Sequence, residues 1–285
     1  MPLTHTDDIV RSAAEDGVGV GAFNVVQLEH AEAIVGGAEA ARRPVILQIS
    51  ENTVRYHGSL EPIGLATLAV ARASSAPVAV HLDHARSTEL VQEAVELGFT
   101  SVMFDASELP YARNVATTRE VTVRCHAANV WVEAELGEVG GKDGAHAPGV
   151  RTDPDEARDF VAATAVDALA VAVGSSHAML TRDAVLDFAL ITRLRDTVSV
   201  PLVLHGSSGV ADAGLTKAVE AGMTKVNVST HLNKAFTRAA RGCLEAHPET
   251  VDPRTYLGPA REAVAAEVAR LLRVLDGGRG QGAVR

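Results

Sequence analysis

The chain has 285 residues, of which 47% are hydrophobic and 22% charged, with a formal net charge of −10. Its length suits a single α/β barrel domain spanning residues 1–285, and its acidic balance argues against binding to nucleic acid. Because it has only two cysteines, no long uninterrupted apolar stretch and no signal-peptide layout, we expect a cytoplasmic protein that does not enter a membrane.

Apolar runs and segments of helical period alternate along the chain. We expect strands at Val18–Val26, Pro44–Ser50, Pro77–Ala85, Thr100–Asp105, Asn129–Leu136, Ala168–Gly174, Pro201–Gly206 and Met223–Ser229. We expect helices at Leu28–Ala41, Leu60–Ala73, Ser87–Leu97, Tyr111–Ala127, Asp155–Val166, Asp183–Arg195 and Asp212–Ala221. This alternation predicts an α/β fold, a (β/α)₈ TIM barrel, with an open doubly wound sheet as the alternative. Two extra C-terminal helices are expected at His231–Ala246 and Pro259–Leu275, before a flexible tail at about 277–285.

Three histidines stand at the ends of three of these apolar runs. His84 lies in PVAVHLDHA, His177 in ALAVAVGSSH and His205 in PLVLHGSSG. The carboxyl ends of barrel strands meet at one face, and three imidazoles there would bind a divalent transition metal, Zn²⁺ in our interpretation, with one position open for substrate. His81 precedes His84 by three residues in the same strand, so strand alternation predicts that it points to the opposite side and serves in packing or in support of a ligand.

Three carboxylates follow the same pattern. Asp83 is adjacent to His84, where it could deliver or remove a proton, or simply cap the following turn. Asp105 and Glu135 stand at the ends of the fourth and fifth strands. They could orient imidazoles or hold the metal in an alternate position, or could be ordinary buried hydrogen-bonding groups.

Small and hydroxylated residues follow the last two strands. Gly206, Ser207 and Ser208 come directly after His205, and the segment 227–230 ends the eighth strand. Barrel loops at these places often hold a phosphate group, although each stretch alone could be a turn without a ligand. The glycine-rich segment 137–154 has no apolar period, which predicts a mobile flap over the site or a plain surface excursion.

The motifs AFN, HLDH, VEAELG, VGSSH, LVLHGSSG and TKVNVST, in this order, resemble those of the class II fructose-bisphosphate and tagatose-bisphosphate aldolases. The resemblance covers nearly the whole chain. It implies a TIM barrel, Zn²⁺, and reversible cleavage of a ketose 1,6-bisphosphate to glycerone phosphate and glyceraldehyde 3-phosphate. Fructose 1,6-bisphosphate is the expected substrate, with tagatose bisphosphate or 5-keto-2-deoxygluconate 6-phosphate as alternatives. It also implies a homodimer or homotetramer and a monovalent cation near the phosphate site.

The resemblance assigns roles to individual residues. His84, His177 and His205 match the metal ligands, and Asp83 matches the acid that protonates the C4 hydroxyl in condensation. Asp143 matches the flap acid that moves the C3 proton, and Asp105 and Glu135 match carboxylates of the alternate metal position or beside the ligands. The residues assigned to substrate or phosphate are Asn24, Ser50, Ala178, Arg182, Gly206, Ser207, Ser208, Asn227, Ser229 and Thr230.

The chain departs from the family pattern at several of these places. Ala178 stands where glycine is frequent, Ser229 where many fructose-specific members have aspartate, Arg182 where lysine is usual, and Lys142 where acidic or apolar residues are commoner. These differences bear on the sugar more than on the reaction.

Two other functions compete with a metal-dependent aldolase. A Schiff-base aldolase would use Lys225 in the eighth strand, but would leave three converging histidines without a function. A non-catalytic partner subunit would need neither Asp83 nor the three histidines, and this chain retains all four.

Overall fold

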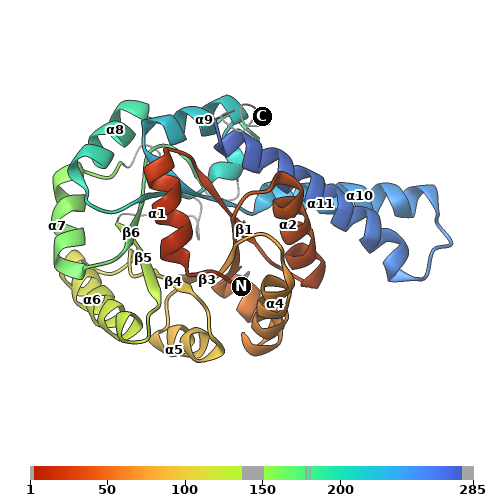
Figure 1. The fold of residues 1–285 in the computed structure, drawn as a ribbon, viewed down its shortest axis with the longest axis horizontal. Coiled ribbons are helices and arrows are strands. Elements are labelled where there is room, and N and C mark those ends of the chain that lie inside the picture. The colour runs from red at the N-terminus through yellow and green to blue at the C-terminus, as the bar shows by residue number, and fades with distance from the viewer. Residues whose placement is uncertain (1–2, 137–150, 177–178, 180, 278–285) are drawn as a thin grey trace.

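The computed structural model describes residues 3–136, 151–176, 179 and 181–277. Eight parallel strands form a closed barrel in which each strand pairs with the next and β8 pairs with β1 (Figure 1). The strands are β1 (Val20–Asn24), β2 (Val45–Ser50), β3 (Val78–Ala85), β4 (Ser101–Phe104), β5 (Trp131–Leu136), β6 (Ala168–Val171), β7 (Leu202–Leu204) and β8 (Met223–Val228). The predicted TIM barrel is confirmed, and the pairing of β1 with β8 rules out the open doubly wound sheet.

Helices surround the barrel where periodic segments were expected. They are α2 (Leu28–Ala41), α4 (Glu61–Ala73), α5 (Thr88–Leu97), α6 (Tyr111–Ala127), α7 (Pro154–Thr164), α8 (Phe188–Thr197) and α9 (Asp212–Ala221), with a 3₁₀ turn η1 (Ser207–Gly209) before α9. The extra C-terminal helices are also present as α10 (Thr230–Ala246) and α11 (Pro253–Leu275), and α11 begins at Pro253 rather than at Pro259. Two helices were not predicted, α1 (Thr6–Asp16) and α3 (Glu51–His57).

Helix α1 lies across one end of the barrel, as its position in front of the strands in Figure 1 shows. Its Ile9, Val10 and Ala13 are buried against side chains from inside the barrel. These side chains are Val20, Ala22, Ile46, Ala79, Trp131, Ala168, Ala170 and Val203. Burial of each large apolar side chain in this way contributes about 1.5–3 kcal/mol to the stability of the folded state. This end of the barrel is therefore closed by apolar packing, and the polar interior lies toward the other end.

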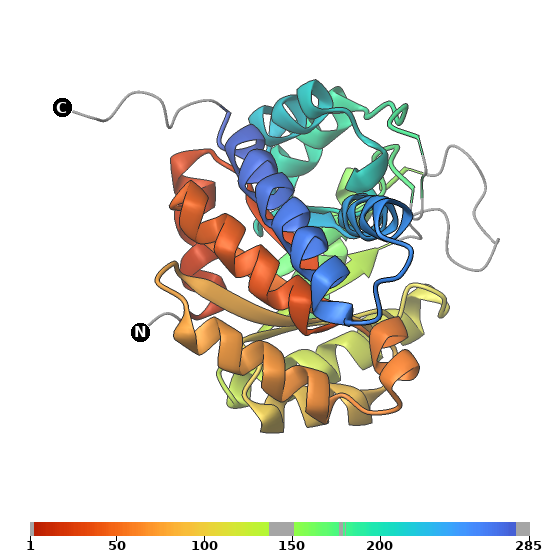
Figure 2. The same cartoon turned by 90° about the vertical axis from the view of Figure 1, so that its right-hand side faces the viewer.

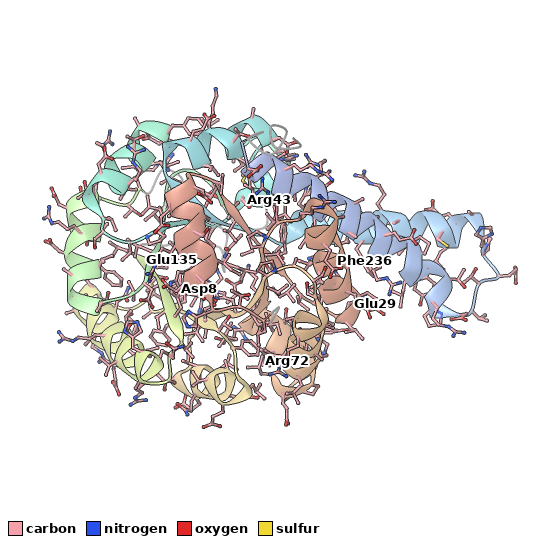
Figure 3. The ribbon with its side chains drawn as sticks, viewed as in Figure 1. Asp8, Glu29, Arg43, Arg72, Glu135 and Phe236 are labelled. Atoms are coloured by element: carbon pink, nitrogen blue, oxygen red, sulfur yellow. The ribbon has the colours of Figure 1, made fainter. Side chains whose placement is uncertain are left out.

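Helices α10 and α11 form a hairpin that projects beyond the barrel in Figure 1, while α11 runs alongside α2 in both Figure 1 and Figure 2. Phe236 of α10, labelled in Figure 3, stacks on His30 of α2 with ring centroids 4.9 Å apart. Arg261 of α11 pairs with Glu32 of α2 at 2.7 Å. The base of the hairpin is thus anchored to the barrel through α2. Among the helices of the described residues, none combines the length and the apolar character needed to cross a membrane.

Candidate metal centre

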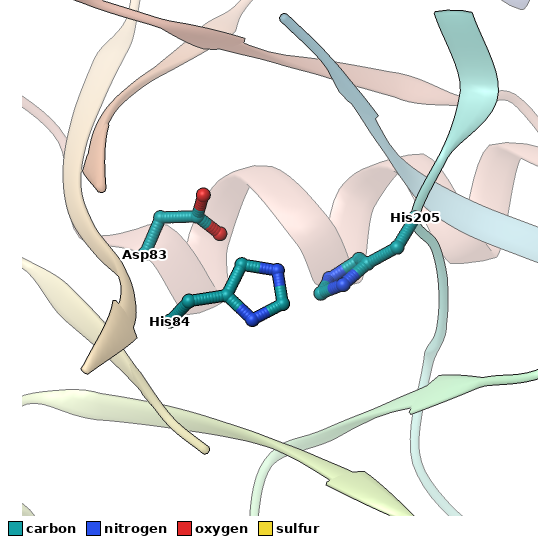
Figure 4. A group of neighbouring side chains, drawn as sticks. All are labelled: Asp83, His84 and His205. Carbon is teal, nitrogen blue, oxygen red and sulfur yellow. The ribbon is translucent and has the colours of Figure 1, made fainter. Parts of the chain in front are cut away.

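Three side chains meet at the carboxyl ends of two barrel strands. Asp83 and His84 come from β3, and His205 directly follows β7 (Figure 4). Each offers one ligand atom, and these atoms all lie within 4.8 Å of one another. We call these three residues the mouth cluster. The His84 and His205 rings are edge to face with centroids 4.7 Å apart, so the structure brings together two of the three predicted metal-binding histidines.

A backbone irregularity explains how neighbouring Asp83 and His84 both reach this cluster. Successive residues of a regular strand point to opposite faces. His84, however, has a φ of 53°, and the pairing of β3 with β4 shifts register between Leu82 and Ala85. A positive φ is uncommon and costly for a residue other than glycine, and such strain is often found at functional sites.

The same irregularity corrects the expectation for His81. His81 does not point away from His84: its Nδ1 lies 2.8 Å from Ser101 Oγ and its Nε2 lies 3.9 Å from Glu133, both inside the barrel. Burial and the nearby charge of Lys225 lower the pKa of His81 to about 3, so it stays neutral. His81 supports the interior below the mouth cluster.

His84 is oriented by one buried carboxylate, and a second buried carboxylate lies near it. Its Nδ1 lies 2.8 Å from Asp105 Oδ2 and 3.9 Å from Glu135 Oε2. His84, Asp105 and Glu135 also form a second group whose ligand atoms lie within 4.8 Å of one another. This arrangement is compatible with both expected roles of the two carboxylates, as partners of a ligand and as an alternate metal position.

His205 is fully buried between two carboxylates of β5. Its Nε2 lies 2.9 Å from Glu133 Oε1 and its Nδ1 lies 3.4 Å from Glu135 Oε2. Burial alone would lower the pKa of His205, but these two glutamates raise it to about 9. Glu133 was not predicted as a site residue. The sequence could have predicted it, because Glu133 and Glu135 are two residues apart in one strand and their side chains must therefore lie on the same face as each other.

Asp83 is held by two side-chain amides. Asn24 Nδ2 donates to Oδ2 at 3.3 Å, and Asn227 Nδ2 donates to Oδ1 at 3.4 Å. Gln48 Nε2 in turn donates to Asn24 Oδ1 at 2.8 Å. Burial would raise the pKa of Asp83, but the positive charges of His84, His205 and Lys225 outweigh it and lower the pKa. Asp83 is therefore a carboxylate oriented by hydrogen bonds and does not act as a turn cap.

Lys225 is a buried cation of β8 among these carboxylates. Its Nζ donates to Glu133 Oε2 and to Asn227 Oδ1, each at 2.8 Å, and its side chain is fully buried. A Schiff-base lysine must reach a substrate carbonyl with a free amine. The buried contacts of Lys225 do not fit that role.

Three of the residues assigned to substrate or phosphate, Gly206, Ser207 and Ser208, follow the end of β7. Gly206 has a φ of 66°, and a Cβ there would stand 2.5 Å from the Ser176 carbonyl oxygen, so the two strand ends approach closely. Ser207 Oγ donates to the Asn227 carbonyl, and Ser208 Oγ accepts from His231 N at 3.2 Å.

The remaining assigned residues stand at the starts of helices or in loops. Ser50 caps α3 by accepting from Thr53 N at 3.3 Å. Ser229 precedes α10, and Thr230 is its first residue. Arg182 donates twice to the Val210 carbonyl, at 2.9 and 2.7 Å, and pairs with Asp212 at 2.5 Å, which braces the turn between η1 and α9.

Several predictions fall on residues that the structure does not describe. His177, Ala178, Asp143 and the greater part of the proposed flap, residues 137–150, lie outside the described residues. The chain just before His177 is placed, and Ser175 Oγ donates to the His205 carbonyl at 2.6 Å. The segment that follows β6 therefore runs beside His205, which carries one of the clustered imidazoles.

The donors of the mouth cluster fit a divalent transition metal. Imidazole nitrogen suits Zn²⁺ and its neighbours in the first transition row, and carboxylate oxygen completes many such sites. The carboxylates beside both histidines are also typical of metal-binding imidazoles.

Comparisons with known proteins identify the family to which this chain is similar. The family model described as fructose-bisphosphate aldolase class-II matches residues 4–278. A Bacillus subtilis (strain 168) protein named probable fructose-bisphosphate aldolase is 41% identical over 277 residues, covering 96% of this chain and 97% of that protein. Among solved structures, the YdjI aldolase from Escherichia coli K12 is 31% identical with a TM-score of 0.85, covering 97% of this chain and 99% of that one. A Campylobacter jejuni fructose-bisphosphate aldolase shares the fold, with a TM-score of 0.77 at 21% identity over 94% of this chain and 93% of that one.

Proposed function

We propose that this chain, which belongs to the class II fructose-bisphosphate aldolase family, reversibly cleaves fructose 1,6-bisphosphate to glycerone phosphate and glyceraldehyde 3-phosphate. The chain is a class II ketose-bisphosphate aldolase, a lyase whose family depends on a metal ion. The observation that carries the chemistry is the mouth cluster, in which a buried carboxylate adjoins two imidazoles. The relative named as a fructose-bisphosphate aldolase, at 41% identity, supports the choice of sugar.

In this proposal the metal is Zn²⁺, held by His84, His205 and His177. When bound, it supplies a Lewis acid that polarises the ketose carbonyl and stabilises the negative charge that develops beside it. Asp105 and Glu133 accept hydrogen bonds from the imidazoles and hold the rings in orientation. Asp105 and Glu135 together offer the alternate metal position.

Asp83 is the proposed general acid and base. In cleavage, its carboxylate takes the proton of the C4 hydroxyl as the C3–C4 bond breaks, and in condensation it returns that proton. The lowered pKa of Asp83 keeps it in the carboxylate form, which is the form that can accept a proton. The amides of Asn24 and Asn227 fix the direction of its oxygens. Asp143 is the proposed acid for the C3 proton.

The glycerone phosphate half would lie against the strand ends around Gly206. Backbone N–H groups and hydroxyls there can bind phosphate oxygens, because glycine allows the backbone to come close. The proposed contacts are Asn24, Ser50, Ala178, Arg182, Gly206, Ser207, Ser208, Asn227, Ser229 and Thr230. A monovalent cation beside the phosphate is also proposed.

The sugar is tested by comparing kcat/KM for fructose 1,6-bisphosphate, tagatose 1,6-bisphosphate and 5-keto-2-deoxygluconate 6-phosphate. The purified chain is assayed with Zn²⁺ added and after chelation. We expect cleavage of the fructose substrate to be the most efficient and to require the metal. A higher kcat/KM for either alternative would transfer the assignment to that sugar, and full activity without metal would remove the proposed mechanism.

We also propose a cytoplasmic homodimer or homotetramer with a single domain. The closed barrel uses strands from both halves of the chain, which supports the single domain. Light scattering on a size-exclusion column gives the oligomeric mass directly, and a monomer at assay concentration would contradict the proposal.

A further inference from the structure

A hydrogen-bonded series of buried polar side chains crosses the barrel interior next to the mouth cluster, and we call it the line. Glu133 stands at its centre: Oε2 accepts from Lys225 Nζ at 2.8 Å, and Oε1 lies 2.9 Å from His205 Nε2. The side chains of all three residues are fully buried. The line therefore links a lysine of β8, a glutamate of β5 and a proposed metal ligand after β7.

The line continues from Lys225 to the proposed acid. Lys225 Nζ also donates to Asn227 Oδ1 at 2.8 Å, and Asn227 Nδ2 donates to Asp83 Oδ1 at 3.4 Å. A side-chain amide has an acceptor end and a donor end. Because Lys225 has only donors, it holds the oxygen of Asn227 and turns the NH₂ group toward Asp83. The flipped amide would place an oxygen against the Asp83 carboxylate and repel it.

At the other end, Glu133 determines which nitrogen of His205 carries the proton. A carboxylate facing an ammonium group acts as an acceptor, so the Glu133 contact assigns a proton to His205 Nε2. The other nitrogen, Nδ1, lies 3.4 Å from Glu135 Oε2 and must give up its proton before it can bind a metal, whereas Glu133 keeps the proton on Nε2. His205 would thus present Nδ1 as its ligand atom.

We propose that the Lys225–Glu133 pair is a positioning device that serves both halves of the site, by setting the tautomer of His205 for metal binding and the orientation of Asn227 against Asp83. The inference rests on the proposed function for its chemistry, but its effect on metal affinity can be measured without any substrate. A purely structural explanation is weaker, because a buried ion pair adds little stability over apolar residues of similar volume.

The decisive variant is Glu133→Gln. A glutamine there can still accept from Lys225 through its oxygen, but its NH₂ group then faces His205 Nε2. That nitrogen must become an acceptor, which moves the proton to Nδ1 and blocks the ligand atom. We expect the Kd for Co²⁺ or Zn²⁺ to rise about 10- to 100-fold, with an altered visible spectrum of the Co²⁺ form and little change in Tm.

The matched control is Asp167→Asn. Asp167 also accepts from an imidazole, His126 Nε2 at 2.9 Å, and from Val132 N at 2.7 Å. It lies directly before β6, at the end of that strand opposite the mouth cluster. The same change of carboxylate to amide should leave metal affinity within about threefold of the wild type. A folded Glu133→Gln protein whose Co²⁺ affinity and spectrum match the wild type would overturn the proposal.

A second variant covers the case in which Glu133→Gln does not fold. The double variant Glu133→Leu with Lys225→Met replaces the pair by apolar side chains of similar volume, a change that buried ion pairs often tolerate. Weakened Co²⁺ binding by this folded protein supports the proposal. Unchanged Co²⁺ binding, or failure of the double variant to fold, would show that the pair is structural and would overturn the proposal.

The proposed function can fail independently of this inference. A wild-type chain that binds Co²⁺ but cleaves none of the three sugars would contradict the proposed function. The ratio of the variant Kd to the wild-type Kd for Co²⁺ would still decide whether the Lys225–Glu133 pair sets the tautomer of His205.

Discussion

His84 Nδ1 lies 2.8 Å from Asp105 Oδ2, across the neighbouring strands β3 and β4. The other Asp105 oxygen, Oδ1, accepts from Ser107 Oγ at 2.6 Å. Asp105 is therefore fixed by the turn after β4, and it fixes His84 in turn. Such a partner holds the ring of a metal-binding histidine in orientation and makes the imidazole a stronger ligand.

We expect Asp105→Ala to weaken metal binding about 10- to 100-fold, because the His84 ring loses its hydrogen-bonded partner. Competition with a chromophoric chelator measures this Kd. Ser107→Ala is the control, since it removes only the bond to the far oxygen and should change the Kd by no more than a few-fold. Equal effects of the two variants would count against the orienting role of Asp105.

Removal of the metal should abolish aldol cleavage. Dialysis against a strong chelator is expected to eliminate detectable kcat, and one equivalent of Zn²⁺ per chain should restore it, because the developing charge needs an electrophile. Metal content by mass spectrometry accompanies each assay. Activity that survives in protein shown to be metal-free would contradict this prediction.

Asp83→Asn should lower kcat by about 10²- to 10⁴-fold, the usual contribution of general acid–base catalysis. Asparagine keeps the size of the side chain but cannot exchange the C4 hydroxyl proton. The bound metal per chain should stay near the wild-type value, which separates loss of proton transfer from loss of the metal. A kcat within tenfold of the wild type would exclude Asp83 as the acid.

Gly206→Ala should destabilise the fold by about 1–3 kcal/mol and raise KM. An alanine Cβ would stand only 2.5 Å from the Ser176 carbonyl oxygen, and the φ of 66° at this position disfavours any residue with a side chain. Gly258→Ala in α11 is the matched control, since a Cβ there meets nothing within 4 Å. Chemical denaturation measures the unfolding free energy of both variants, and the rate of cleavage at several substrate concentrations gives KM. A Gly206→Ala protein as stable as the control would show that the turn adapts.

Glu267 should make stability depend on pH. Burial would raise its pKa, but hydrogen bonds from His231 and Arg270 lower it to about 2 from a usual 4.5. Because the folded-state pKa is the lower one, this stabilisation is fully present above about pH 4.5 and is lost as the pH falls toward 2. Glu267→Gln should cost about 1–2 kcal/mol of unfolding free energy at pH 7 and less below pH 4.

Urea unfolding between pH 2 and 7 tests this dependence. Glu262→Gln, at an exposed position of the same helix, should follow the wild-type curve throughout. A Glu267→Gln curve that runs parallel to the wild type at every pH would contradict the assignment.

Periodicity and residue type predicted the eight strands and the helices between them, but they left a closed barrel and an open doubly wound sheet as alternatives, and the pairing of β1 with β8 decided between the two. The expected strand ends at Val26, Gly174 and Gly206 lay two or three residues beyond the observed ends at Asn24, Val171 and Leu204. Eight apolar runs separated by helical segments admit few arrangements, and residues at the carboxyl ends of parallel strands must converge at one face. This is why His84 and His205 could be placed together from their spacing. Helix α3 was not predicted, because seven residues carry too little periodic signal.

Only the tertiary structure decided how the interior side chains are directed and paired. Regular alternation would have turned His84 away from Asp83, and a local register shift with a positive φ reversed that direction. The contact of Lys225 with Glu133 joins residues 92 positions apart, and the partner that a buried charge finds depends on the register of every strand between them. A sequence pattern reports which face a residue occupies, whereas hydrogen-bond partners across a barrel follow from its closure.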